Sequence, residues 1–334
     1  MNRHPCRVLA ALVLFVLLAG CGGSASAQDQ PQLILRYAEN QPENYPTTRA
    51  ARYFADLVEQ RTQGNIRVRV YADGELGDES SVLEQVQFGG IDIARTSLGA
   101  MVVKCPDLSV LQLPYLYEDS DQMWRVLDGD IGASFLTVTR RDGIVGLSWF
   151  DAGARSFYTC EPIQTLGDFK GLRIRVQENE TIGEIVKALG AIPEQIAYND
   201  VYSAIMSGKV DGAENNWPSY ASTGHYEGAP YVYLDEHTRV PEMQIMSTVA
   251  VDAVMAVNPD YYTILCQCAK ESALYERELW AETEEKAREE MLEKGVVVTV
   301  PTEADAAEMR QMMAVIYEDL TAEELEIVDK IRES

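Results

Sequence analysis

The sequence predicts an α/β protein of two domains. Strand patterns alternate with helix patterns along the chain, and 334 residues are enough for about two domains. A single helical pattern then runs from Asn258 to Lys294. At about 1.5 Å per residue, this helix would be roughly 55 Å long, which exceeds the diameter of a small domain. We therefore expect it to run across both domains, with a break near Ser272 as the alternative.

The first half of the chain alternates regularly. Apolar periodicity predicts strands at Leu33–Tyr37, Ile66–Val70, Ile91–Thr96 and Ile144–Phe150. Helices are expected from a Thr47 or Thr48 cap to Gly64, from the loop 73–78 through Phe88, and over residues 121–140. This order is typical of parallel sheets flanked by helices.

The second half of the chain also alternates strand patterns with helix patterns. Strands are expected at Arg173–Val176, Val210–Glu214, Gln244–Val251 and Val296–Val300. Helices are expected at Thr181–Leu189, at Asn199–Ser207 before Gly208, and in two acidic segments at the C-terminus. The last of these opens on a capping box, Thr321 with Glu324. We assign residues 32–152 and 241–280 to domain I, and residues 153–240 and 281–334 to domain II.

The N-terminus predicts a targeting segment. Arg3 and Arg7 precede an apolar run, Val8 to Ala19, which is too short to span a bilayer comfortably. The following Leu18 to Cys21 resembles a bacterial lipobox, so we expect residues 1–20 to be a lipoprotein signal peptide and Cys21 to be lipidated. Residues 21–31 would be a tether.

The alternative for this segment is an ordinary secretory signal that is cut after Ala25 or Ala27. Under both interpretations the mature protein works outside the cytoplasm. With the lipid anchor, it would sit in the periplasm or on the outer face of the cytoplasmic membrane.

The net charge and the cysteines limit which partners, metal sites and disulfides the protein can have. The net charge of −25 makes nucleic acid and anionic membrane surfaces poor partners, although a buried arginine can still bind an anion locally. No Cys/His spacing resembles a metal site, and no cofactor is expected. Beyond Cys6 and Cys21, the remaining cysteines are Cys105, Cys160, Cys266 and Cys268. Export permits disulfides, and a Cys105–Cys160 bridge is open.

The motifs of several common enzymes are absent from the sequence. It contains no G-x-S-x-G, no H-E-x-x-H and no P-loop. His225 and His237 lack a metal-ligand spacing and are interpreted as hydrogen-bonding or structural residues. The expectation is a protein that is not an enzyme.

The segment from Asp168 to Val176 is the strongest candidate for an anion site. Arg173 and Arg175 alternate with apolar residues, which places the two arginines on one face of a strand. A guanidinium held in this way can bind a carboxylate through two hydrogen bonds. The alternative is that both arginines pair with surface acids.

Further polar residues recur near predicted strand ends, where α/β proteins bind ligands. Together they suit a small acid that carries hydroxyl groups. They are Asn40, Glu75, Arg95, Arg155 and Asn215. Trp217 would either stack on a sugar face or belong to the core.

Several longer motifs resemble those of a known family. The chain is similar to the extracytoplasmic solute-binding proteins of TRAP (tripartite ATP-independent periplasmic) transporters from about Leu33 to its C-terminal region. The motifs are Gly74–Gly77, Gly89–Asp92, Leu113–Tyr117, Leu166–Arg175 and Val210–Asn215.

This resemblance implies a two-domain periplasmic-binding-protein fold that closes on a ligand between its domains. A long helix spanning both domains is a feature of the family. Arg175 matches the family's carboxylate-binding arginine, while Arg155, Asn215 and Asn40 match further binding positions. The implied partners are a small organic acid and the membrane subunits of a TRAP transporter.

The departures from the family pattern indicate which acid the protein binds. Gln177 stands where the family often has proline, and Asn216-Trp217 replaces another common proline. The segments 214–220 and 236–242, which contain His237, resemble the branch that binds hexuronates. Glu75 and Arg95 also fit a polyhydroxy acid. We therefore expect D-glucuronate or D-galacturonate, with Asn216, Trp217 and His237 among the ligand-binding residues.

Several alternatives remain open. The nearest is a protein of the same family that binds a dicarboxylate or 2-oxo acid. An ABC-type binding protein is disfavoured by the long helix, and a secreted uronate lyase or isomerase lacks a convincing base.

Overall fold

The computed structural model describes residues 30–334. The predicted signal peptide, Cys21 and all of the tether up to residue 29 lie outside the described residues. No helix among residues 30–334 combines the length and apolar character that crossing a membrane requires.

The first sheet contains five strands in the order β2-β1-β3-β10-β4. Their bounds are β1 Leu33–Ala38, β2 Ile66–Tyr71, β3 Ile93–Ser97, β4 Ile144–Phe150 and β10 Glu242–Ser247. β1 runs parallel to β2 and β3, as predicted. β10 is antiparallel to β3 and β4, so the prediction of parallel sheets is wrong here. The chain reaches β10 directly from β9 in the second sheet, so it enters the first sheet in the opposite direction to its neighbours.

The second sheet contains six strands in the order β11-β9-β5-β8-β6-β7. Their bounds are β5 Ala154–Thr159, β6 Arg173–Val176, β7 Ile192–Gln195, β8 Gly212–Asn215, β9 Tyr231–Arg239 and β11 Val297–Thr299. β5 is antiparallel to β8 and β9, so this sheet is mixed too. Sequence analysis missed β5, β7 and β9.

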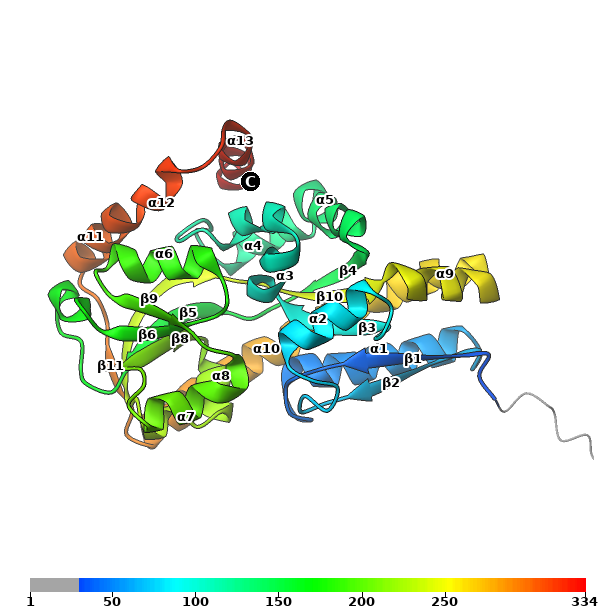
Figure 1. The fold of residues 1–334 in the computed structure, drawn as a ribbon, viewed down its shortest axis with the longest axis horizontal. Helices are drawn as coiled ribbons and strands as arrows, with labels where there is room; N and C mark the ends of the chain where they lie inside the picture. Colours follow the sequence, from blue (N-terminus) through cyan, green and yellow to red (C-terminus); the bar gives the residue numbers. More distant parts are fainter. Residues whose placement is uncertain (1–29) are drawn as a thin grey trace, which may run out of the picture. The chain divides into compact units, whose positions relative to one another are not determined.

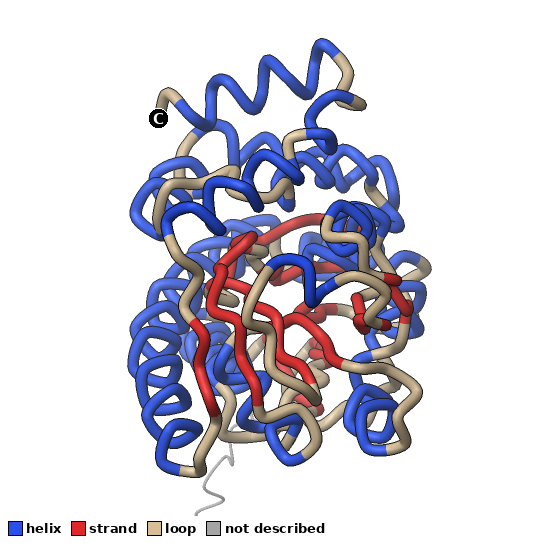
Figure 2. Tube along the Cα trace, turned by 90° about the vertical axis from the view of Figure 1, so that its left-hand side faces the viewer, coloured by secondary structure: helices blue, strands red, loops and turns tan. Residues whose placement is uncertain are grey.

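Helices surround both sheets, and the strands lie between them (Figures 1 and 2). In the first half the α-helices are α1 Pro46–Arg61, α2 Glu79–Gln87, α3 Leu98–Lys104, α4 Ser120–Leu127 and α5 Asp130–Val138. Those that follow are α6 Glu180–Ala188, α7 Val201–Met206, α8 Trp217–Ser222, α9 Thr248–Val257, α10 Pro259–Glu293, α11 Glu303–Met313, α12 Val315–Glu318 and α13 Ala322–Arg332. Short 3₁₀ turns η1–η5 occupy Pro106–Gln112, Thr139–Asp142, Leu166–Phe169, Tyr198–Asp200 and His225–Glu227.

Two predicted helices and one predicted strand need correction. α1 starts at Pro46, whose fixed φ suits a first turn, and Thr47 and Thr48 are buried inside it. The single helix expected over 121–140 is two helices, because Asp128 is the C-cap of α4 and Gly129 is the N-cap of α5. The strand expected to reach Val251 stops at Ser247, whose hydroxyl caps α9.

Three stretches of chain connect the sheets. β4 in the first sheet leads through residues 151–153 to β5 in the second, and β9 leads through Val240 and Pro241 to β10. The third stretch is α10, a single helix of 35 residues, so the long helix is confirmed and no break occurs at Ser272. α10 packs on α1, α9 and β4 and also on α8 (Figure 1). Each sheet with its helices is called a lobe below.

The buried hydrophobic core is only partly divided between the two lobes. One buried cluster lies under the first sheet with α1, α9 and the start of α10, and another lies under the second sheet with Met291 near the end of α10. A third cluster includes residues of both lobes. α11 and α12 pack on α6, whereas the Gln122 side chain on α4 donates to the carbonyl of Ile331 in α13 at 3.1 Å. The domain boundaries therefore stay a prediction.

The described cysteines are not bridged. Cys105, Cys160, Cys266 and Cys268 are all free thiols, so the Cys105–Cys160 bridge left open by the sequence does not form. Cys105 is buried between the end of α3 and the start of η1, whereas Cys160 follows β5 in the other lobe.

Candidate functional site

β6 carries the two arginines of the predicted anion site, and they behave differently. The Arg173 guanidinium lies at the surface and pairs with the Asp211 carboxylate at 2.6 Å. Arg175, two residues further, is only 2% exposed. β6 is covered on both edges by β7 and β8, so its backbone is held firmly in place.

Arg175 is a buried cation without a countercharge. Its Nε donates to the carbonyl of Ile196 at 2.8 Å, and one terminal nitrogen is buried without any partner. Among the described residues no carboxylate forms an ion pair with it. Burial therefore lowers the pKa of Arg175, because removal from water disfavours the charged form. Such a group is suited to receive a carboxylate from outside the chain.

Arg175 lines a cavity of about 50 Å³ between the lobes. Its walls come from the ends of β1 and β3, the start of α2, and the segments after β6 and β7. They include Asn40, Glu79, Ser97, Gln177, Tyr198 and Asn199. One water molecule occupies about 30 Å³ of liquid, so this volume holds roughly one or two waters. An organic acid therefore needs the lobes to separate before it can enter.

Several hydrogen bonds hold the lobes together around this cavity. The Tyr45 hydroxyl lies 3.0 Å from the Ser219 hydroxyl, and Tyr198 donates to the Gln41 side chain at 3.3 Å. Ser80 on α2 donates to Glu178 at 3.1 Å. These contacts join the lobes directly, so the structure is a closed arrangement.

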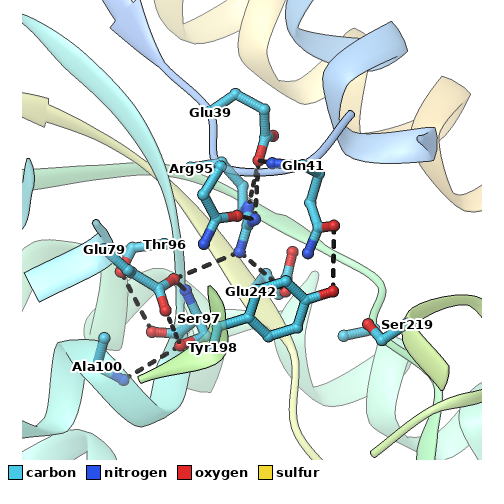
Figure 3. Close-up of polar contacts among 12 residues, drawn as sticks. Glu39, Gln41, Glu79, Arg95, Thr96, Ser97, Ala100, Tyr198, Ser219 and Glu242 are labelled. Atoms are coloured by element: carbon cyan, nitrogen blue, oxygen red, sulfur yellow. Dashed lines mark hydrogen bonds and ion pairs between the residues drawn. The ribbon is translucent and has the colours of Figure 1, made fainter. Parts of the chain in front are cut away.

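Arg95 on β3 sits in a cluster of carboxylates beside the cavity (Figure 3). Its guanidinium donates to Glu39 at 2.8 and 3.0 Å, to Glu242 at 3.1 Å and to Glu79 at 3.3 Å. It also contacts the amide oxygen of Asn40. One cation therefore faces three acids.

The cluster has a surplus of acceptors. One carboxylate oxygen of Glu39 and one of Glu242 are buried without a donor. Burial, followed by the neighbouring acids Glu39 and Glu79, raises the pKa of Glu242 to about 7 against the opposing pull of Arg95. The surroundings of Arg95 can thus accept hydroxyl hydrogens, while Arg175 can donate to an anion.

Arg155 on β5 is fully compensated. Its guanidinium forms a two-point ion pair with Glu214 on β8, with one N–O distance of 2.8 Å, and donates to the Asn215 amide oxygen at 3.1 Å. Despite complete burial, this pairing lowers the pKa of Glu214 to about 2. Arg155 and Asn215 lie next to each other, as the sequence suggested, but neither is among the residues that line the cavity.

His237 lies behind this pair, not in the cavity. Its Nδ1 is 2.8 Å from Asp235, its Nε2 is 3.7 Å from Glu214, and its ring stacks on Phe157 with the centroids 4.4 Å apart. The 3.7 Å distance is too long for a hydrogen bond but short enough for an ion pair. The two carboxylates overcome burial and raise the pKa of His237 to about 9. Within residues 30–334, no group of His, Cys, Asp and Glu could hold a metal ion.

Three other predicted site residues lie elsewhere. Glu75 is exposed in the loop before α2. Asn216 caps α8 by accepting from the Ser219 backbone at 2.8 Å, and it donates to the Ala152 carbonyl at 2.9 Å. Trp217 is partly buried and packs against Tyr220 at the edge of the core of the second lobe.

Sequence reasoning missed the acids that surround Arg95, as well as Tyr198. Glu39 and Glu242 are far apart in the sequence and meet only because β1 and β10 both lie beside β3. The sequence analysis selected Glu75 and not Glu79. Glu79 is nevertheless the better-placed acid, because it lies in the first turn of α2 directly after the Asp78 cap, which fixes its backbone.

The profile of the family DctP, described as "Bacterial extracellular solute-binding protein, family 7", matches residues 37–324. A solute-binding protein of Chromohalobacter salexigens is 33% identical over 287 residues, which are 86% of this chain and 84% of that protein.

Solved structures agree with the fold. A TRAP periplasmic solute-binding protein from Xanthobacter autotrophicus Py2, with bound β-D-galacturonate, has a TM-score of 0.86 and 35% identity, covering 90% of this chain and 99% of that one. Another from Roseobacter denitrificans, with bound β-D-glucuronate, has a TM-score of 0.82 and 36% identity, covering 90% and 97%. The match over most of the chain, together with the two-lobed fold, shows that this protein belongs to the DctP family of bacterial extracellular solute-binding proteins.

Proposed function

We propose that the protein is the extracytoplasmic receptor of a TRAP transporter and that its ligand is a sugar acid, with D-galacturonate and D-glucuronate as the leading candidates. The observation that carries this is the buried, uncompensated guanidinium of Arg175 in the cavity between the lobes. It would bind the carboxylate of the ligand in a two-point contact. Similar structures with bound galacturonate and glucuronate support the ligand class.

The acids around Arg95 favour a sugar acid over a dicarboxylate. A second carboxylate placed beside Glu39, Glu79 and Glu242 would meet like charges at low dielectric, which is unfavourable. A sugar hydroxyl would instead donate to the unpartnered oxygens of this cluster. The 2-oxo acid alternative is disfavoured for a related reason, because a small 2-oxo acid lacks the hydroxyls to satisfy these acceptors.

The remaining ligand contacts are inferred from where each residue lies relative to the cavity. Asn40 and Glu79 line the cavity with Arg175 and would contact the sugar, with Arg95 behind them. Arg155 and Asn215 would reach the ligand after a small rearrangement of the lobes. His237 would act through Glu214, and the proposed contacts omit Glu75, Asn216 and Trp217.

Binding would close the lobes. We propose domain I at residues 32–152 and 241–280 and domain II at residues 153–240 and 281–334, turning about the three connecting stretches. Contacts such as Tyr198 to Gln41 exist only when the lobes meet, so a ligand that bridges them favours closure. The closed form would dock on the membrane subunits of the transporter.

The protein would be exported and anchored. We propose that residues 1–20 are removed and that Cys21 carries a lipid, which would hold the receptor in the periplasm at the outer face of the cytoplasmic membrane. The segment 21–31 would act as the tether between the anchor and the lobes.

A thermal-shift panel tests the ligand class. Galacturonate, glucuronate, galactonate, succinate and pyruvate are each mixed with the purified mature protein. At 100 times its Kd, a ligand adds about 2.7 kcal/mol to the free energy of unfolding. A shift with succinate or pyruvate, and none with the uronates, would refute the sugar-acid assignment. Chromatography of the uronate after incubation tests the lyase or isomerase alternative, which requires a new product.

A further inference from the structure

A further buried acid lies where the lobes are joined. Glu276 sits in the middle of α10 and its side chain is fully buried. One carboxyl oxygen accepts the backbone N–H of Asp151 at 2.8 Å, and the other has no hydrogen-bond partner. Asp151 begins the connection 151–153, which links β4 to β5.

This connection is held from several sides. The Asp151 side chain accepts the N–H of Gly153 at 2.8 Å, and Asn216 on α8 donates to the Ala152 carbonyl at 2.9 Å. Ala152 also packs with Trp280, one helical turn after Glu276. The backbone of the connection therefore depends on the state of the α10 face that includes Glu276 and Trp280.

The charges facing Glu276 are mostly negative. Asp151 on the connection and Glu242 on β10 raise its pKa well above the ordinary value, in addition to the larger effect of burial. Arg277, the neighbour on α10, opposes this weakly because its guanidinium is paired with Asp128 at 2.7 and 2.8 Å.

A further acid, Glu284, lies on the same face of α10 two turns after Glu276 and approaches Gly153 of the connection. Burial first, and then Asp151, raises the pKa of Glu284 to about 7, against the pull of Arg239 and with smaller contributions from Glu236 and Glu285. None of the ion pairs in residues 30–334 includes Glu276. An ionised carboxylate in this environment would be strongly disfavoured, so the closed arrangement requires a proton.

We propose that Glu276 is a positioning residue for lobe closure: in its protonated form it holds the connection 151–153, and separation of the lobes admits water and releases the proton. Closure on the ligand therefore takes up a proton at Glu276. This rests on the proposed function only in naming a sugar acid as the molecule that closes the lobes.

Glu276→Gln is the informative variant. The amide keeps a carbonyl oxygen for the Asp151 N–H and supplies N–H groups where the protonated acid has its hydroxyl, so it imitates the protonated state. The control is Glu278→Gln, an exposed position two residues further along the same helix.

Titration calorimetry with galacturonate, in buffers of different ionisation enthalpy between pH 6 and pH 9, counts the protons taken up. The wild type and Glu278→Gln should take up protons and lose affinity as pH rises, by at most about tenfold per pH unit for a single proton. Glu276→Gln should take up fewer protons and should keep its affinity over the same range. Equal uptake in the wild type and Glu276→Gln would overturn the proposal.

A second measurement detects the proton directly. Infrared spectroscopy at pH 7.5 compares the galacturonate-bound protein with the unliganded protein. The bound wild type should gain the carbonyl stretch of a buried protonated acid, and this gain should be smaller in Glu276→Gln and unchanged in Glu278→Gln. An unchanged gain in Glu276→Gln would mean that another group holds the proton and would refute the inference. If the wild type fails to bind any uronate at pH 6, the proposed ligand class fails, and the acid that the thermal-shift panel identifies then replaces galacturonate in both measurements, which still decide the role of Glu276.

Discussion

Arg173 and Arg175 lie two residues apart on β6, yet only one of them has a countercharge. Arg173 pairs with Asp211 at 2.6 Å at the surface, whereas Arg175 is 2% exposed and forms no ion pair within residues 30–334. The strand thus carries a structural arginine and an available one, and the pair provides its own experimental control.

Replacement of Arg175 by methionine should abolish measurable sugar-acid binding and stabilise the unliganded protein. The two lost charged hydrogen bonds correspond to about 1.5–3 kcal/mol each, so together they weaken Kd by roughly 10²- to 10⁴-fold. Removal of an unpaired buried cation should raise the free energy of unfolding by about 0.5–2 kcal/mol. Calorimetry and urea denaturation measure the two effects.

Arg173→Met is the control for this prediction. It removes a surface ion pair, so both the affinity and the free energy of unfolding should change by less than about 1 kcal/mol. Equal loss of binding in the two variants would contradict the assignment of Arg175.

The acids around Arg95 should set the selectivity. Because the pKa of Glu242 is raised to about 7, the test is made at pH 8, where Glu79→Gln and Glu242→Gln each remove a charged acceptor. Galacturonate should then bind about tenfold more weakly or worse, while succinate should bind less poorly than it does to the wild type. The measurement is the ratio of the two Kd values. A ratio unchanged by both substitutions would show that the cluster only supports the fold.

Glu214 should stabilise the protein at neutral pH through Arg155. Its folded pKa is lowered to about 2, so this contribution is present above the ordinary value of 4.5 and is lost as pH falls from there towards 2. Glu214→Gln leaves Arg155 buried without its ion pair and should cost about 3–5 kcal/mol at pH 7. The stability difference between wild type and variant should shrink below pH 4.5 in urea titrations.

His237 should make a contribution to stability that is lost at high pH, whereas the contribution of Glu214 is lost at low pH. Its folded pKa is raised to about 9, so the stabilisation is fully present below pH 6.5 and is lost as pH rises through 9. His237→Gln should be less stable than the wild type at pH 6, and the difference should narrow by pH 9. A difference that stays constant over this range would contradict a charged imidazole.

The free thiols give a simple check. A reducing agent should leave the melting temperature unchanged, because Cys105, Cys160, Cys266 and Cys268 form no bridge. Burial raises the pKa of Cys105 to about 11, so this thiol should react with iodoacetamide only after denaturation. A melting temperature that falls on reduction would indicate a disulfide.

Elements with a clear local signature were predictable from the sequence. The alternation in Arg173–Val176, the capping box at Thr321 and the uninterrupted helical pattern after Asn258 all correspond to observed elements. Arg175 was identified because it lies on the strand with the clearest pattern. Its burial was not encoded locally, because Arg173 has the same strand context and lies at the surface.

Features that depend on distant pairings were not predictable. β5 and β9 have irregular polar patterns and were missed, since each exists through its antiparallel neighbour. The acids near Arg95 come together only through the strand order of the first sheet. His237 was assigned to the ligand, yet the structure places it against Asp235 and Glu214, a relationship that no spacing in the sequence reveals.

Trp280 gives the molecule a built-in optical reporter. Its indole is buried against Ala152 and Tyr45, and its Nε1 has no hydrogen-bond partner. Any displacement of the 151–153 segment changes the polarity around this indole and hence its emission. Intrinsic fluorescence can therefore follow opening and closing in real time without an attached dye.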